Sequence, residues 1–155
     1  MLPFVIRPIS RAITAAVRDT LRAPGYGHPA HRELARGTGP CRECLSEFAV
    51  KKDDRLLFTY NAFEGSGSVA QPGPVFIHAE PCEPFAGDGY PAGLKALPIL
   101  AEAHFEDGSR SALRTVAPGD EATILADLIR QPGVLFLNLR HAEAGCFIAR
   151  VEHSA

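Results

Sequence analysis

The sequence has no apolar run that approaches the ~18 residues of a membrane-spanning helix, so we expect no membrane partner. It also lacks an excess of one charge, because 16 Lys and Arg residues stand against 18 Asp and Glu residues. Nucleic-acid-binding domains usually carry a basic patch and a high pI, so this balance argues against a nucleic-acid partner. The motifs G-x-x-x-x-G-K-[ST], G-x-G-x-x-G and G-x-S-x-G are absent, which leaves nucleotide binding and serine-hydrolase chemistry without support.

Cysteine is scarce, with four residues and no secretory signal pattern ahead of them. Cysteines in that context are typical of a reducing compartment, so we expect a cytoplasmic protein with free thiols. A length of 155 residues and a hydrophobic content of 46 % predict a single domain, residues 1–155, with an ordinary core. A chain of this size needs no metal in order to fold, and we therefore expect no obligatory cofactor.

Two segments carry the periodicity and end signals of helices. Residues 10–22 begin with Ser10 as a candidate N-cap and end before Pro24-Gly25, and residues 120–131 begin with Asp120 and end before Pro132-Gly133. Short apolar runs predict strands at 4–6, 56–60, 75–78, 134–137 and 146–149, and Asp107-Gly108 predicts a hairpin that pairs 99–105 with 110–116.

The remaining segments are rich in turn residues. We expect irregular loops over 24–40, 61–73 and 80–93, and a turn over 138–145. Strands joined by turns and loops favour an antiparallel sheet. The sequence thus predicts an α+β fold, with a largely antiparallel or mixed sheet and two main helices packed against it.

Three segments carry a resemblance to a known family. Residues 39–42 (Gly-Pro-Cys-Arg), 73–78 (Gly-Pro-Val-Phe-Ile-His) and 142–147 (Ala-Glu-Ala-Gly-Cys-Phe) resemble, in order and spacing, the motifs of a bacterial family known as domain of unknown function 1203. Where that family's pattern leads us to expect histidines before the final turn, this chain has Asn138 and Arg140. The resemblance implies a fold over nearly the whole chain, and it implies no reaction.

One cysteine pattern is a candidate metal site. Cys41 and Cys44 form C-x-x-C, and His78 and Cys82 form H-x₃-C thirty-four residues further on. Three thiolates and one imidazole suit a tetrahedral zinc ion, so this set predicts a zinc-stabilised interaction module. The alternative is that Cys44 and Cys82 are incidental loop thiols and that no metal binds. A redox role for C-x-x-C lacks the βαβ context that such motifs usually have.

A second hypothesis is a cysteine-dependent enzyme. Cys146 or Cys41 would be the nucleophile, with His141 as the base and Arg42 as a nearby positive charge that favours the thiolate. The alternative is that Cys41 and Cys146 are small buried hydrophobes, as free cysteines commonly are. Whether the protein is an enzyme therefore stays open.

The hypothesis we prefer is a small-molecule binding or sensing domain. Its pocket would lie between the 39–44 loop and the 138–147 turn, and its ligand-binding residues would be Arg42, His78, Asn138 and Arg140. Guanidinium groups and an imidazole suit a carboxylate or phosphate, so the expected partner is a small anionic molecule. The sequence leaves the oligomeric state open.

Overall fold

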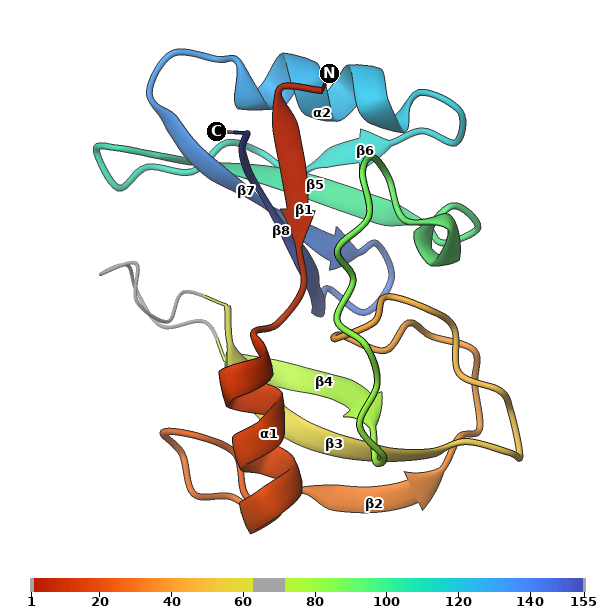
Figure 1. Cartoon of the computed structure of the whole chain (residues 1–155). Coiled ribbons are helices and arrows are strands. Elements are labelled where there is room, and N and C mark those ends of the chain that lie inside the picture. The colour runs from red at the N-terminus through yellow and green to blue at the C-terminus, as the bar shows by residue number, and fades with distance from the viewer. Residues whose placement is uncertain (1, 63–71, 155) are drawn as a thin grey trace. The chain divides into compact units, whose positions relative to one another are not determined.

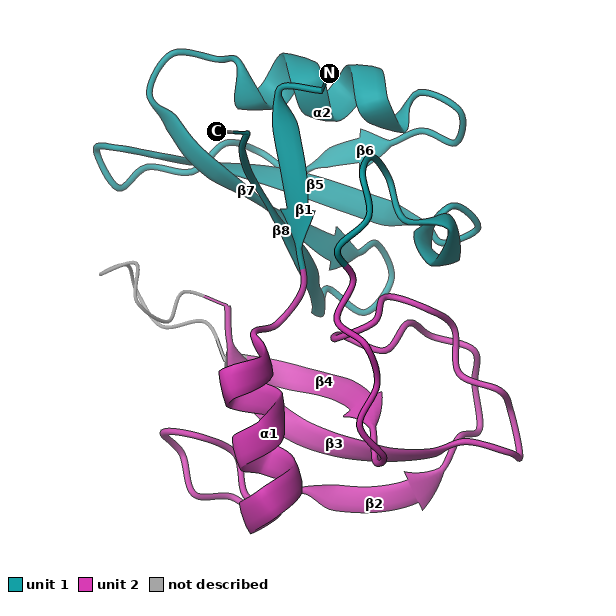
Figure 2. Cartoon of the chain, in the orientation of Figure 1, with its two compact units in different colours: residues 1–7, 86–155 teal, residues 8–85 magenta. Residues whose placement is uncertain are grey.

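The chain divides into two units, and the strands of each unit form their own antiparallel sheet. The computed structural model describes residues 2–62 and 72–154. Unit 1 comprises Met1–Arg7 and Ala86–Ala155, and unit 2 comprises Pro8–Phe85 (Figure 2). Unit 2 is therefore inserted into the sequence of unit 1.

Unit 2 contains one helix and a three-stranded sheet. The helix α1 (Arg11–Thr20) is followed by β2 (His31–Leu34), β3 (Asp54–Asn61) and β4 (Pro72–His78), and the strand order is β2-β3-β4 (Figure 1). The long segment between β2 and β3 has no regular structure. It contains both cysteines of the C-x-x-C motif.

The helix α1 begins and ends as its sequence predicts. Ser10 has extended backbone angles, and its side chain accepts a hydrogen bond from the backbone N–H of Ile13. The helix ends at Leu21, which adopts a left-handed conformation with φ of 53° and donates its N–H to the carbonyl of Val17. Val17 and Thr14 are fully buried, so one face of the helix packs inside unit 2.

Unit 1 contains a five-stranded sheet covered on one face by a helix. Its strands are β1 (Phe4–Arg7), β5 (Ile99–Phe105), β6 (Arg114–Val116), β7 (Val134–His141) and β8 (Phe147–His153), in the order β1-β8-β7-β5-β6. The helix α2 (Glu121–Ile129) packs against these strands, and a short 3₁₀ helix η1 (Ala92–Leu94) precedes β5 (Figure 1).

The α+β class, the antiparallel strands and both helices are confirmed. Asp120 occupies the N-cap position of α2, but its side chain makes no capping hydrogen bond. We expected an irregular loop over residues 24–40. This prediction was wrong in part, because β2 forms within that range. Three of its four side chains are exposed, so its sequence shows no apolar alternation. The strand forms through backbone pairing with β3, which brings His31 opposite Leu57.

The hairpin of unit 1 has the predicted register, with Ile99 opposite Val116 and Gly108 at a φ of 86°. Its second strand is shorter than predicted because the side chain of Ser111 accepts the N–H of Ala103, which a backbone carbonyl would otherwise accept. The predicted turn over 138–145 was too long. The strand β7 continues to His141, so Asn138 and Arg140 lie on a strand.

Among the described residues, no helix is both long and apolar enough to cross a membrane. Residues 63–71 of the loop predicted between 61 and 73 lie outside the described residues.

Candidate metal centre

Four side chains of unit 2 meet at one point. They are Cys41 and Cys44 from the loop before β3, His78 from the end of β4, and Cys82 from the segment after it. Their ligand atoms all lie within 4.8 Å of one another. These are the four residues that the C-x-x-C and H-x₃-C spacing singles out, and all four cysteines of the chain are free thiols.

Two spacings within the cluster match those of a tetrahedral metal site. Two thiolates bound at ~2.3 Å to one tetrahedral zinc ion lie about 3.8 Å apart, and a thiolate and an imidazole nitrogen lie about 3.6 Å apart. The Sγ atoms of Cys41 and Cys82 are 3.8 Å apart, and Cys44 Sγ is 3.6 Å from His78 Nδ1. These two spacings fit ligands of one shared metal ion, and every pair of ligand atoms in the cluster lies within 4.8 Å.

A tight turn brings the two thiols of C-x-x-C to the same side. The N–H of Leu45 donates to the carbonyl of Cys41 at 2.8 Å, and the N–H of Cys41 donates to Ser46 at 2.9 Å. Leu45 closes the turn with a φ of 59°, which is unfavourable for a leucine. Its side chain is buried, and this burial offsets the backbone strain.

A carboxylate fixes the orientation of His78. Asp53 Oδ2 lies 3.1 Å from Nε2 of the imidazole and also accepts the N–H of Ala49 at 2.8 Å. With the Nε2 proton held by Asp53, the lone pair of Nδ1 points toward Cys44 and is available to a metal. The N–H of Ala49, and then His78, lower the pKa of Asp53 below its usual value, so this carboxylate is ionised at neutral pH.

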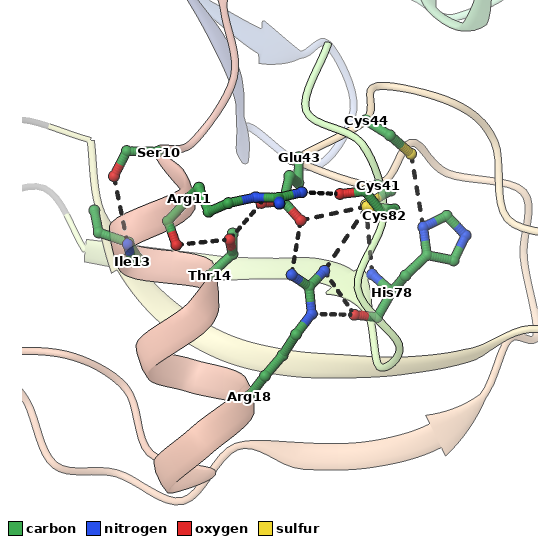
Figure 3. A network of polar contacts seen from close by, with 10 residues as sticks. All are labelled: Ser10, Arg11, Ile13, Thr14, Arg18, Cys41, Glu43, Cys44, His78 and Cys82. Carbon is green, nitrogen blue, oxygen red and sulfur yellow. Dashed lines mark hydrogen bonds and ion pairs between the residues drawn. The ribbon is translucent and has the colours of Figure 1, made fainter.

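A buried glutamate links the cysteine turn to α1 (Figure 3). Glu43 lies between the two cysteines of C-x-x-C, and its side chain is fully buried. Its Oε1 is 2.8 Å from Nη1 of Arg18 and accepts a hydrogen bond from Cys82 Sγ at 3.3 Å. Thr14 donates its hydroxyl to Oε2 of the same carboxylate. A buried charge needs such partners, and α1 supplies them.

The arginines of α1 also hold the segment that carries Cys82. Arg18 donates to the carbonyl of His78 at 3.1 Å and approaches Cys82 Sγ at 3.8 Å. Arg11 donates to the carbonyl of Cys82 at 2.6 Å. The segment after β4 has no regular structure, so these side-chain contacts place Cys82 next to Cys41.

The thiols of Cys44 and Cys82 ionise unequally. Hydrogen bonds from Cys41 and then from Cys82 lower the pKa of Cys44, to about 2. The pKa of Cys82 is raised, because its hydrogen bonds to Cys41 and Cys44 and its burial favour the protonated thiol. Thiolates this close repel one another, so a cation between them favours the ionised form of Cys82.

The cluster is reachable from solvent on one side. A hollow of about 290 Å³ is lined by His78 and Cys82 together with Asp53, Asp54, Glu80 and Lys52. Cys41, in contrast, is fully buried. The acidic residues of the hollow attract cations, so this side is the natural entry path for a metal ion.

The other predicted site residues have structural contacts of their own. Arg42 is buried in unit 2 and donates to the carbonyl of Pro40 at 2.6 Å, and its backbone N–H donates to Phe76. In unit 1, Nδ1 of His141 accepts the N–H groups of Glu143 and Ala144 and so stabilises the turn before Cys146.

The pocket predicted between the 39–44 loop and the 138–147 turn would join residues of both units, and it stays a prediction. Gly145 has a φ of 74°, a left-handed conformation that this turn needs and that glycine adopts without strain.

The sequence analysis did not identify Glu43, Asp53, Thr14 and Arg18 as part of the site. A signal for Thr14 and Arg18 is present in retrospect. Arg11, Thr14 and Arg18 recur at helical spacing on one face, and this polar face is where a buried acid such as Glu43 would find partners.

A family model described as protein of unknown function (DUF1203) matches residues 38–153, which is well over half of the chain. The chain belongs to this family. The matched region contains all four residues of the metal cluster, and the resemblance read from the sequence motifs is confirmed. No curated protein and no solved structure matches the chain.

Proposed function

We propose that the protein binds one zinc ion through Cys41, Cys44, His78 and Cys82, and that this ion is the structural centre of unit 2. The observation that carries the proposal is the convergence of four ligand atoms within 4.8 Å, from three separate segments of the chain. Incidental loop thiols would have no reason to meet a histidine whose other nitrogen is already held by a carboxylate.

The donor set favours zinc over harder cations. Three thiolates and one imidazole are soft or borderline ligands, and Mg²⁺ and Ca²⁺ prefer sets of oxygen atoms. Two of the ligand spacings, 3.8 Å and 3.6 Å, fit tetrahedral coordination. The cytoplasmic setting expected from the sequence suits such a site, since it would keep the thiols reduced.

The coordination shell favours a structural role for the metal. Four protein ligands complete a tetrahedral zinc ion and leave no position for a water or a substrate, whereas catalytic zinc sites keep one position open. Three thiolates and one Zn²⁺ carry a net negative charge, and Arg18, at 3.8 Å from Cys82 Sγ, lies where it offsets that charge.

The centre would fasten the irregular parts of unit 2 to its sheet. It joins the cysteine turn to the end of β4 and to the segment after β4. These are regions with little regular structure of their own. A surface built on this unit, as in an interaction module, would depend on the metal for its shape.

Metal analysis of the purified chain tests the proposal. We expect one zinc per chain, and we expect Cys82→Ser to lose it, because serine does not replace a thiolate ligand. Cys146→Ser is the matched control, since Cys146 is a thiol in the other unit and should leave the zinc content unchanged. Cobalt substitution should give the intense visible spectrum of tetrahedral cobalt–thiolate coordination.

Asp53→Asn provides a graded variant. It keeps the shape of the side chain but weakens its hold on His78, so we expect zinc affinity to fall about 10- to 100-fold in competition with a chelator. The proposal is wrong if the wild-type chain, refolded with equimolar zinc under reducing conditions, binds less than stoichiometric metal, or if Cys146→Ser and Cys82→Ser lose zinc equally.

A further inference from the structure

A row of polar side chains crosses the middle of the sheet in unit 1. Glu102 on β5 lies opposite Asn138 on β7, and Asn138 lies opposite Arg150 on β8. Alternation along the strands places His104 and Arg140 on the same face as this row. The other face is apolar, with Ala101, Ala103, Leu137 and Leu139 all buried.

Asn138 is the unusual member of the row. Its side chain is fully buried, and neither its Oδ1 nor its Nδ2 has a hydrogen-bond partner in the described part of the chain. A buried amide without partners is costly, and such groups are rare in folded proteins. Without a bound ligand, an apolar residue of the same shape would stabilise the sheet better than this amide does. The buried amide therefore indicates that a ligand binds here.

The neighbours of Asn138 give the site its charge. Glu102 Oε1 lies 3.2 Å from Nη2 of Arg140 and 3.0 Å from Nε2 of His104. Burial lowers the pKa of His104 to about 4, so the imidazole is neutral at pH 7. Glu102 is the carboxylate of this row, and Arg140 and Arg150 are its guanidinium groups.

Aromatic stacking fixes two of these side chains. The ring of His104 stacks on that of Phe136 with 4.8 Å between centroids, and the guanidinium of Arg150 lies 4.0 Å over Phe136. These contacts limit the rotamers of the polar groups, as a binding site requires. The side chain of Arg140 keeps 14 % of its surface exposed, so the row reaches solvent at that end.

We infer that this face of the unit 1 sheet binds a small organic anion that carries an O–H or N–H donor beside its carboxylate. The Nδ2 group of Asn138 would donate to the carboxylate, and Oδ1 would accept the ligand's donor. Arg140 would add a charge-assisted hydrogen bond. The site is independent of the zinc centre, because all of its residues belong to unit 1.

Isothermal titration of the zinc-loaded full chain with malate tests the inference, with succinate as the matched anion that lacks the hydroxyl donor. We expect malate to bind and succinate to bind at least about tenfold more weakly, because only malate satisfies Oδ1 of Asn138. Glycolate, lactate and aspartate extend the panel, since each has a carboxylate and a neighbouring donor.

Asn138→Leu separates binding from folding. It replaces the unpaired amide with an apolar side chain that has the same number of non-hydrogen atoms and the same branching, so we expect the melting temperature without ligand to stay level or rise and malate binding to be lost. Asn138→Asp, which adds a negative charge, should also abolish binding, and Arg114→Gln, which removes a charge on β6 outside the row, should not.

The inference is overturned if none of the four donor-bearing carboxylates binds. It is also overturned if Asn138→Leu lowers the melting temperature sharply, since the amide would then be satisfied within the fold. Zinc content is measured in the same samples, so a failure of this site and a failure of the metal centre give different results.

Discussion

Unit 1 and unit 2 have nearly the same length, but their interiors differ in kind. Among the described residues, the twelve largest fully buried side chains divide into eight of unit 1 and four of unit 2, which are Ile9, Leu45, Leu56 and Ile77. Unit 1 pairs five strands and covers them with α2, whereas unit 2 pairs three strands and places thiols, a histidine and a buried carboxylate beside them. A small apolar core is marginal by itself, and a metal cross-link is one established remedy.

The largest expected effect comes from removing zinc. Structural zinc contributes on the order of 10 kcal/mol of binding free energy, which is comparable to the whole folding free energy of a domain. We therefore expect a chelator to unfold unit 2 at 25 °C and to leave the sheet of unit 1 paired. Amide hydrogen exchange would show loss of protection in β3 and β4 with protection retained in β7 and β8.

The Cys146→Ser variant controls for a general effect of thiol loss, and it should keep both sets of amides protected. Equal loss of protection in β3 and β7 on chelation would contradict the expected difference between the units, since both units would then depend on the metal.

Truncation of a buried apolar side chain in unit 1 should destabilise unit 1 and leave the metal centre of unit 2 intact. Leu139 is fully buried on β7, and Leu139→Ala leaves a cavity that costs about 3 kcal/mol in the free energy of unfolding. We expect denaturant unfolding of unit 1 to shift to lower concentration while the zinc content stays at one per chain. Loss of zinc in this variant would mean that the metal centre depends on the core of the other unit.

The smallest expected effect is a pH dependence confined to unit 1. His104 has a folded pKa of about 4, below its unfolded value near 6.5. The folded state therefore binds fewer protons than the unfolded state. The contribution of the neutral imidazole to the free energy of unfolding is fully present above pH 6.5 and is lost as the pH falls toward 4. We expect a loss of about 2 kcal/mol at pH 4.5, after allowance for the partial screening of this site.

His104→Gln should remove that loss, and unfolding followed by amides of β5 and β7 measures it. The same pH change would weaken the proposed metal binding in unit 2, because protons compete with the metal for its ligands, so unfolding must be followed at amides of unit 1 alone. An unchanged pH profile in the variant would assign the loss to other groups.

The sequence predicted the fold better than it predicted the site. Helix caps, the Asp-Gly hairpin and apolar strands are local signals, and they placed both helices and most strands. The strand β2 was missed because its formation depends on backbone pairing with β3, and its exposed side chains carry no pattern.

The candidate metal ligands could be listed from their spacing, but their convergence could not. His78 and Cys82 are brought to the cysteine turn by tertiary contacts, among them those of Arg11 and Arg18. Asn138 was expected in the turn between the strands predicted at 134–137 and 146–149, whereas it lies within β7 opposite Glu102. Residues that act across strands or between segments leave no local signal in one sequence.

The cysteine turn also ties down the two ends of the inserted unit. The N–H of Ile9 donates to the carbonyl of Arg42 at 3.0 Å, and the N–H of Phe85 donates to the carbonyl of Glu43 at 2.9 Å. Entry and exit of the insertion are thus fastened to adjacent residues, which lie between two proposed metal ligands.

This arrangement has a consequence for the order of events during synthesis. The strand β1 pairs with β8, so Phe4 must wait for a partner as distant as His153, and every residue of unit 2 is made in between. Unit 2 has all its own residues by Phe85. A ribosome-bound chain supplied with zinc could therefore fold its middle first, which would hold Arg7 and Ala86 on a short tether. The entropy cost of bringing β1 back to the sheet would then be that of a small loop.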